Sequence, residues 1–290
     1  MAEQSNSQKV VKGISSQTLV TLLMGVLEVI VFSIMSRLLS KEDFGLFAAI
    51  SAITLVFGSL SEAGIGSALI QKKNADNGYV NTSFTISFIS GSVFALLLIA
   101  LSGILSKTII DESLKVPLIF MSITILCNSL TSVNTSVMYR RLEFLQVGMV
   151  NFLALVISSS IAIGLALKGM GFEAIISKAI LQSLTATVLS YFLAKTKYRF
   201  QIECKDIGAI VNFGGWLTLS VIFRNFANQA DKLLMSKLLS VASLGAYNRP
   251  KEFIDTISTK LNGIFDTALF PILSGIQDQK NSIRNAYHTS

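Results

Sequence analysis

Long apolar stretches are the feature that most limits how this chain can fold. A bilayer core about 30 Å thick is crossed by about 20 mostly apolar helical residues. Eight such stretches follow one another along the 290 residues. The composition agrees with this pattern, since 51% of the residues are hydrophobic, 14% are charged and the mean hydropathy is +0.62. The expected spans are 17–39, 44–70, 79–106, 115–138, 147–168, 173–194, 208–238 and 244–273. We therefore predict an all-α polytopic membrane protein.

An internal repeat indicates how the spans are grouped. Met35-Ser-Arg-Leu-Leu-Ser40 returns as Met235-Ser-Lys-Leu-Leu-Ser240, and Phe44-Gly45 aligns with Leu244-Gly245 in the same register. Six spans precede the second copy, so both copies would enter the membrane from the same side, as in parallel transporter repeats. We expect a six-helix lobe over 1–200 and, over 201–290, the first two helices of a second lobe that is incomplete in an apparently truncated chain. The alternative is eight unrelated helices with a chance match.

The distribution of basic residues predicts the orientation. Lys and Arg favour cytoplasmic loops, and the richer side holds the N-terminus and the linker around 195–207. The N-terminus is therefore expected in the cytoplasm. This asymmetry and anionic headgroups explain the net charge of +7, so no nucleic-acid partner is expected. The single histidine lies in the polar tail and there are two cysteines, which is too few for a zinc site or a disulfide framework.

Charged residues inside a span are costly and often mark transport pathways. Glu28 and Glu62 stand alone in the first two spans. Each fits a packing role about as well as a proton or cation site. Lys178 lies about one turn from the start of its span, where a lysine can extend its ammonium to the membrane interface.

The seventh and eighth spans carry most of the intramembrane polarity. Arg224, Asn228 and Asp231 are spaced for one helix face, beside Asn225. That face is either a cavity wall or an ion pair that fixes packing. In the eighth span the polar face consists of Asn248, Glu252, Asp255, Thr259, Asn262 and Asp266, flanked by Arg249, Lys251 and Lys260. This segment either lines a cavity or lies as an amphipathic helix at the interface.

Several motifs carry a family resemblance. They are Ser36-Arg-Leu-Leu-Ser-Lys-Glu-Asp-Phe-Gly-Leu-Phe-Ala48, Glu62-Ala-Gly-Ile-Gly-Ser-Ala-Leu-Ile-Gln71, Arg140-Arg141 and Asp231-Lys-Leu-Leu-Met-Ser-Lys-Leu-Leu239. The chain resembles polysaccharide-biosynthesis flippases of the Wzx type, within the superfamily of multidrug, oligosaccharidyl-lipid and polysaccharide exporters. The resemblance implies two six-helix lobes around a central cavity that opens alternately to each side. It also implies export of undecaprenyl-pyrophosphate-linked oligosaccharide across the bacterial cytoplasmic (inner) membrane. The family has a complete second lobe. This chain differs from the family pattern, because it contains only the first two helices of that lobe.

Within that expectation, charge and hydrogen-bonding capacity suggest roles. Arginine and lysine suit a diphosphate, so we assign Arg224, Arg249 and Lys251 to the anion. Sugar hydroxyls are assigned to Asn225, Asn228, Thr259 and Asn262. A coupling proton or sodium ion, the one cofactor considered, is assigned to Glu28, Glu62, Asp231 and Asp255. The expected partners are the lipid-linked oligosaccharide, membrane lipids, and polysaccharide polymerase and glycosyltransferases.

Three other functions remain open. A cation-coupled multidrug exporter of the same architecture would need a more acidic and more apolar cavity. A membrane-embedded glycosyl- or acyltransferase would need a positioned base or a pair of metal-binding carboxylates, and the spans contain no histidine and no Asp-x-Asp. We therefore do not expect an enzyme. The third is a non-functional fragment or an assembly scaffold.

Overall fold

The computed structural model describes the chain from residue 2 to residue 258 with gaps. The described residues are 2–62, 64–72, 75–109, 114–203, 207–208, 210, 220, 223–225, 227–232, 234–235, 237–240, 242–255 and 258. Of residues 2–15 and 108–109 only the backbone is described.

Seven helices form the first part of the chain. They are α1 Ala2–Leu38, α2 Lys41–Glu62, α3 Ile65–Gln71, α4 Asn77–Ile109, α5 Lys115–Arg140, α6 Phe144–Leu167 and α7 Gly171–Ala194. Within the described residues they provide six segments long and apolar enough to cross a membrane, with α2 and α3 together forming one of them. These segments coincide with the first six predicted spans. The prediction of an all-α, multi-pass membrane protein is therefore confirmed.

The second predicted span differs from the expectation of one continuous helix over 44–70. α2 ends at Glu62, and α3 begins at Ile65 after Gly64, whose φ of 61° lies in the left-handed region. Glycine adopts this conformation without the steric cost of a Cβ atom, so the chain can change direction here. The break places Glu62 at the carboxyl end of α2 rather than inside a helix.

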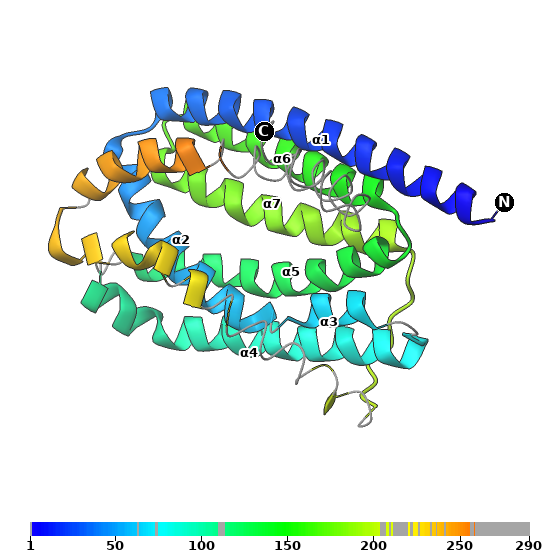
Figure 1. Ribbon diagram of the computed structural model, residues 1–290. Coiled ribbons are helices and arrows are strands. Elements are labelled where there is room, and N and C mark those ends of the chain that lie inside the picture. Colours follow the sequence, from blue (N-terminus) through cyan, green and yellow to red (C-terminus); the bar gives the residue numbers. More distant parts are fainter. Residues whose placement is uncertain are drawn as a thin grey trace, which may run out of the picture.

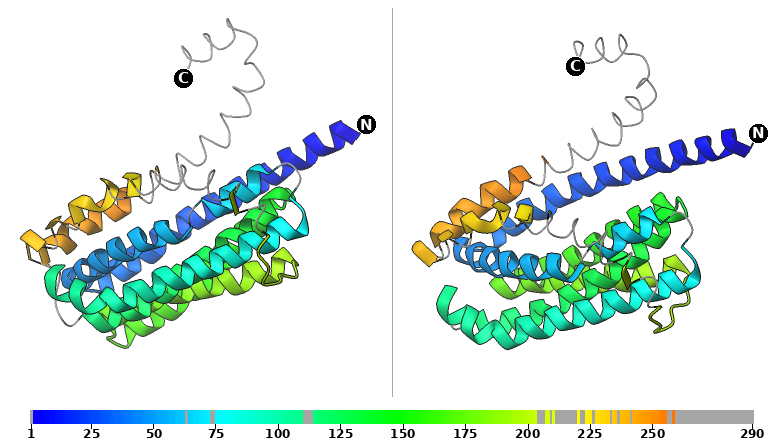
Figure 2. Two further views of the ribbon diagram at one scale, coloured as in Figure 1. Left: turned by 90° about the horizontal axis from the view of Figure 1, so that it is seen from below. Right: turned by 60° about the horizontal axis from the view of Figure 1, so that its bottom comes forward.

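The long helices form a curved row in the order α1, α6, α7, α5 and α4 (Figures 1 and 2). α2 packs against α4, α5 and α7, and α3 continues along α4 and α5. One apolar core joins Ile50 of α2, Leu98 of α4 and Leu118 of α5. A second core joins α1, α2, α6 and α7 around Val31, Phe44 and Ala162. α2 packs on one side of this row, and a space remains between α2 and α6. The candidate site described below occupies that space.

Hydroxyl and amide groups link the helices where the bilayer offers no water. Ser129 Oγ donates to the Ser87 carbonyl at 2.9 Å, which joins α5 to α4. Asn134 Nδ2 donates to Ser190 Oγ at 3.0 Å and joins α5 to α7. Small residues and interhelical hydrogen bonds are the usual means of association between transmembrane helices.

The second copy of the repeat packs against the first. Helical residues 242–255 lie beside the end of α1 and the start of α2 (Figure 2). Phe253 contacts Phe32 with ring centroids 5.7 Å apart, and Leu244 is buried against Ala48 and Ala49. This contact lies at the end opposite the 195–203 linker, which is the outer end in the predicted orientation.

The repeat also recurs in local structure. Ser40 and Asp43 cap α2 reciprocally, since the Asp43 amide donates to Ser40 Oγ at 3.1 Å and the Ser40 amide donates to Asp43 Oδ2 at 2.9 Å. At the equivalent position the Ser243 amide donates to Ser240 Oγ at 3.2 Å. The division into lobes at residue 200 stays a prediction, and much of 208–238 and 244–273 lies outside the described residues.

Candidate functional site

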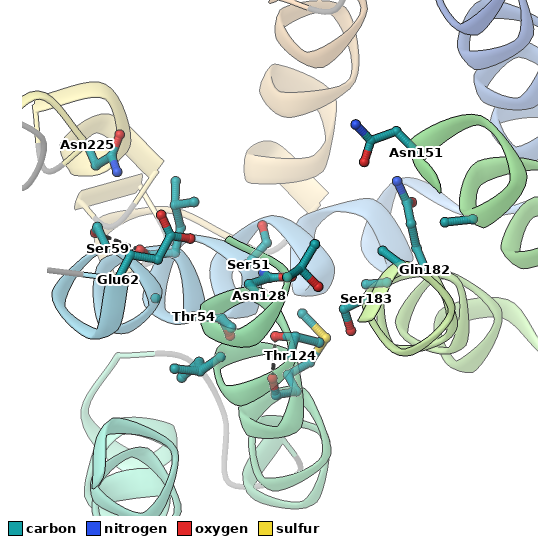
Figure 3. A pocket seen from close by; sticks show the side chains of 18 of the residues that line it. Ser51, Thr54, Ser59, Glu62, Thr124, Asn128, Asn151, Gln182, Ser183 and Asn225 are labelled. Carbon is teal, nitrogen blue, oxygen red and sulfur yellow. Dashed lines mark hydrogen bonds between the residues drawn. The ribbon is translucent and has the colours of Figure 1, made fainter. Parts of the chain in front are cut away.

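A polar cavity of about 520 Å³ lies between α2, α5, α6 and α7, with residue 225 at one side (Figure 3). Its volume is within the usual range of small-molecule sites. The polar side chains that line it are Ser51, Thr54, Ser59, Glu62, Thr124, Asn128, Thr131, Asn151, Gln182, Ser183 and Asn225. Hydroxyl and amide groups therefore converge inside a bundle whose outer surface is apolar.

The hydroxyl groups of the cavity are already oriented by their own helices. Ser51 Oγ donates to the Ala48 carbonyl at 3.0 Å, Thr54 Oγ1 to Ile50 at 2.9 Å, and Ser183 Oγ to Ile180 at 2.9 Å. A hydroxyl that donates its proton in this way keeps its lone pairs as acceptors. These residues can therefore accept hydrogen bonds from a ligand that carries hydroxyl groups.

The amide groups supply both donors and acceptors. Asn128 of α5 and Asn151 of α6 are exposed and line the cavity, and Gln182 of α7 extends toward Asn151 (Figure 3). No hydrogen bond joins these three amides to another described residue. A primary amide offers two N–H donors and one carbonyl acceptor, so the set is complementary to the mixed donor and acceptor pattern of a sugar.

Glu62 is the only charged residue among the described residues that line this cavity. Its carboxylate extends into the space from the carboxyl end of α2 (Figure 3). The cavity is therefore polar and carries at most a single negative charge from these residues.

Two smaller cavities adjoin the central one. A cavity of about 270 Å³ shares Phe47, Ala179 and Gln182 with it and extends toward Met35 and Phe44. A cavity of about 260 Å³ shares Glu62, Asn128, Thr131 and Asn151 with it and extends toward Tyr139. The three spaces form a series along the bundle, from the end near α1 and α2 to the end near the linker.

Lys178 of α7 lines the cavity near α1, together with Glu28 of α1 and Glu252. The sequence predicted that this lysine extends to the membrane interface. The structure corrects that prediction, because the side chain is partly buried and faces two carboxylates inside the bundle. Packing of α1 and residues 242–255 over this part of α7 encloses it.

Three of the residues proposed from the sequence line cavities. Glu62 and Asn225 line the central cavity, and Glu28 lines the cavity beside it. They come from α2, from helical residues 223–225 and from α1. The structure thus brings the first, second and seventh predicted spans to adjoining cavities, and the eighth span joins them through Glu252.

Arg249, Lys251 and Asp231 are engaged elsewhere. The Arg249 guanidinium donates to the Leu39 carbonyl and stacks over the Phe44 ring at 4.5 Å from its centroid. Lys251 forms an ion pair with Asp231, whose carboxylate also accepts a hydrogen bond from the Tyr247 hydroxyl at 2.7 Å. These groups join the seventh and eighth spans to each other and to the end of α1.

Three further proposed residues that the structure describes are not among the residues that line these cavities. Arg224, Asn228 and Asp255 are exposed. Thr259 and Asn262 lie outside the described residues.

The sequence analysis missed most of the cavity, because it searched the spans for charges. Asn128, Asn151 and Gln182 are uncharged, yet a buried amide in an apolar span also needs a partner. Asn134 shows why the residue type alone is not decisive, since its amide is satisfied by Ser190 in a helix contact. The amide residues in the first six spans were visible in the sequence. Only the fold shows which of these amides line a cavity and which form hydrogen bonds between helices.

A family model described as polysaccharide biosynthesis protein matches residues 34–290. The chain belongs to this family. The match covers most of the chain and confirms the resemblance to Wzx-type proteins.

Curated relatives match most of the chain at low identity. The lipopolysaccharide biosynthesis protein WzxC of Escherichia coli (strain K12) is 21% identical over 280 residues, which is 96% of this chain and 57% of the relative. The teichuronic acid biosynthesis protein TuaB of Bacillus subtilis (strain 168) is 20% identical over 286 residues, 98% of this chain and 59% of the relative. The succinoglycan biosynthesis transport protein ExoT of Rhizobium meliloti (strain 1021) is 22% identical over 245 residues, 84% of this chain and 50% of the relative.

The chain thus spans about half to three-fifths of the length of these relatives. These names describe biosynthesis and transport proteins, in agreement with the prediction of a transporter rather than an enzyme. No solved structure shows significant similarity to the chain.

Proposed function

We propose that the chain is the cavity-forming part of a flippase that moves an undecaprenyl-pyrophosphate-linked oligosaccharide across the bacterial cytoplasmic membrane. The observation that carries this proposal is the central cavity, where amides and acceptor hydroxyls line about 520 Å³ inside a membrane-spanning bundle. A glycan crossing a bilayer loses its hydrogen bonds to water, and unsatisfied polar groups are costly in hydrocarbon. The cavity offers replacements for those hydrogen bonds.

The arrangement of the cavities supports alternating access. The three adjoining spaces run along the bundle, while residues 242–255 close against α1 and α2 at the outer end. In the proposed cycle, the glycan enters the series from the cytoplasmic side, and separation of this outer contact releases it. The lipid tail stays in the bilayer beside the exposed apolar faces of the helices.

The proposed orientation places the N-terminus and the 195–203 linker in the cytoplasm. Exposed Lys195, Lys197 and Arg199 follow α7 at this end, where anionic headgroups attract basic residues. Glu28, Glu62, Asp231 and Asp255 remain the candidates for a coupling proton or sodium ion. Polysaccharide polymerase and glycosyltransferases remain the proposed protein partners.

The second candidate is a cation-coupled multidrug exporter. Glu62 favours it, since a single carboxylate in a mostly uncharged cavity can attract a cationic drug. The many hydroxyl and amide groups favour the glycan instead, because a lipophilic cation does not need them.

Depletion of the gene product that contains this chain distinguishes the two. Lipid-linked oligosaccharides are extracted from intact cells and from inverted membrane vesicles after treatment with a glycosidase that cannot cross the membrane. The proposal predicts that these lipids accumulate with their glycan on the cytoplasmic side and that surface polysaccharide is lost. Unchanged glycan lipids together with new sensitivity to cationic drugs would replace the flippase with the drug exporter.

A further inference from the structure

Lys178 is a basic residue inside the bundle. The proposed function assigns it no role. Lys178 lines the cavity of about 270 Å³ beside the central one. At 1.5 Å per residue it lies about 10 Å along the helix axis from the start of α7 at Gly171. No hydrogen bond or ion pair joins its ammonium to another described residue. An ammonium in such a place retains three N–H donors for a ligand.

Two carboxylates act on this ammonium from different elements. Glu28 is on α1 and Glu252 is in helical residues 242–255, so negative charge acts on the lysine from both elements. Glu252 also accepts a hydrogen bond from Asn248 Nδ2 at 3.1 Å, and Asn248 is only 2% exposed. The two carboxylates therefore lie near Lys178 without forming a direct ion pair with it among the described residues.

The cavity of Lys178 opens to the central one through shared residues. Gln182 lies one helical turn beyond Lys178 on α7 and lines both spaces, as do Phe47 and Ala179. A ligand with its glycan among Asn128, Asn151 and Gln182 would thus place its next group toward Lys178. The basic residues first assigned to the anion are less suitable. Arg249 and Lys251 already bind Leu39 and Asp231, and Arg224 lines neither cavity.

We propose that Lys178 is the residue that binds the diphosphate of the lipid-linked cargo, and that Glu28 and Glu252 weaken this binding so that the cargo can be released. The inference rests on the proposed function. A lysine that binds the diphosphate differs from a lysine in a structural ion pair in one measurable respect. Removing the lysine should weaken anion binding, whereas removing either carboxylate should strengthen it, because like charges repel.

The test measures binding of farnesyl diphosphate to the purified full-length protein in detergent, with farnesol as the uncharged probe. Lys178→Gln should weaken diphosphate binding about 10-fold or more, in line with the loss of a charge-assisted hydrogen bond. Lys178→Arg should retain most of the affinity. Glu252→Gln should increase affinity about 2- to 10-fold. Lys195→Gln removes the same charge from an exposed position in the linker and should leave binding unchanged.

Thermal unfolding of each variant separates a folding defect from a binding defect. Wild-type affinity in a folded Lys178→Gln protein would overturn the inference and leave the flippase proposal intact. Weaker binding in both Lys178→Gln and Glu252→Gln would also overturn it, since that result indicates a structural charge cluster. If the wild-type protein binds no diphosphate, Lys178 is not an anion site, and the glycan sidedness assay still decides the proposed function.

Discussion

A Cβ atom on Gly245 would overlap the backbone carbonyl oxygen of Lys41. The same Cβ would lie 3.0 Å from the amide nitrogen of Gly45, the residue that matches Gly245 in the repeat. The two copies of the repeat therefore meet backbone to backbone at equivalent glycines. Such close contact between helices requires residues without side chains.

Gly245→Ala should therefore loosen the contact between residues 242–255 and α2. Because the obstacle is backbone rather than a flexible side chain, we expect a loss of about 1–3 kcal/mol from overpacking and reduced transport. Thermal unfolding in detergent and surface polysaccharide report the two effects. Gly164→Ala in α6 is the matched control, since no neighbouring group lies within 4 Å of its added Cβ and it does not line the cavities, and alanine should be neutral or stabilising there. Equal behaviour of the two variants would contradict the close contact.

Arg140 and Arg141 hold the linker end of the bundle together through backbone carbonyls. Arg140 donates to the carbonyls of Leu69 and Lys72 at the end of α3, and Arg141 Nη1 donates to the Ala194 carbonyl at the end of α7 at 2.5 Å. Hydrogen bonds of charged groups contribute about 1.5–3 kcal/mol. Arg140→Ala should lower the free energy of unfolding by about that amount.

Both bonds come from Arg140 Nη1. A lysine side chain is shorter and ends in a more strongly hydrated ammonium, so Arg140→Lys should restore only part of the stability. Lys197→Ala, at an exposed linker position, is the control and should change little. Full stability of Arg140→Ala in a thermal unfolding measurement would show that these hydrogen bonds are dispensable.

Tyr198 packs the linker against α4. Its ring stacks on Phe84 with centroids 4.2 Å apart, and burial raises the pKa of Tyr198 from its ordinary value of 10.0 to about 12. A raised pKa in the folded state means that the stabilising contribution is complete below pH 10 and is lost as the pH rises toward about 12. The wild-type protein should therefore lose stability above pH 10 faster than Tyr198→Phe, which keeps the stacking. Parallel pH profiles for the two proteins would refute the assignment.

The cavity amides should matter for transport but little for folding. Gln182→Leu and Asn128→Leu remove hydrogen-bonding groups that no described residue uses. We expect normal abundance and stability with glycan export slower by about 5-fold or more, since each lost hydrogen bond to a ligand contributes about 1 kcal/mol or more. Asn134→Leu is the contrasting variant, because its amide is bonded to Ser190, and it should reduce stability first. Export at the wild-type rate in both cavity variants would remove these amides from the glycan path.

The spans could be predicted from the sequence because bilayer thickness sets their length and the chain has few charges to obscure the pattern. The break at Gly64 was missed because 44–70 was treated as one apolar span, although Glu62, Gly64 and Gly66 interrupt that span locally. Lys178 was misplaced for a different reason. A lysine near a helix end can extend to the interface, unless other helices cover it, and that depends on tertiary structure.

The candidate site was predicted in outline and missed in detail. Glu28, Glu62 and Asn225 were identified by their cost in an apolar environment and do line connected cavities. The eighth-span residues Arg249 and Lys251 satisfied the same criterion but contact Leu39 and Asp231 instead. A charge in a span predicts that a partner exists, but only the fold shows whether the partner is a ligand or another residue.

The central claim is that the glycan passes through the cavity between α2, α5, α6 and α7. The most direct test places a photo-crosslinking amino acid at Asn128, which faces the cavity, or at Phe120, which lies on the same helix and is 62% exposed on the apolar surface. After irradiation of membranes with sugar-labelled lipid-linked oligosaccharide, the lipid is removed by mild acid and the label retained on the protein is measured. We predict labelling from position 128 and none from position 120. Equal labelling from both positions, or none from position 128, would contradict the account.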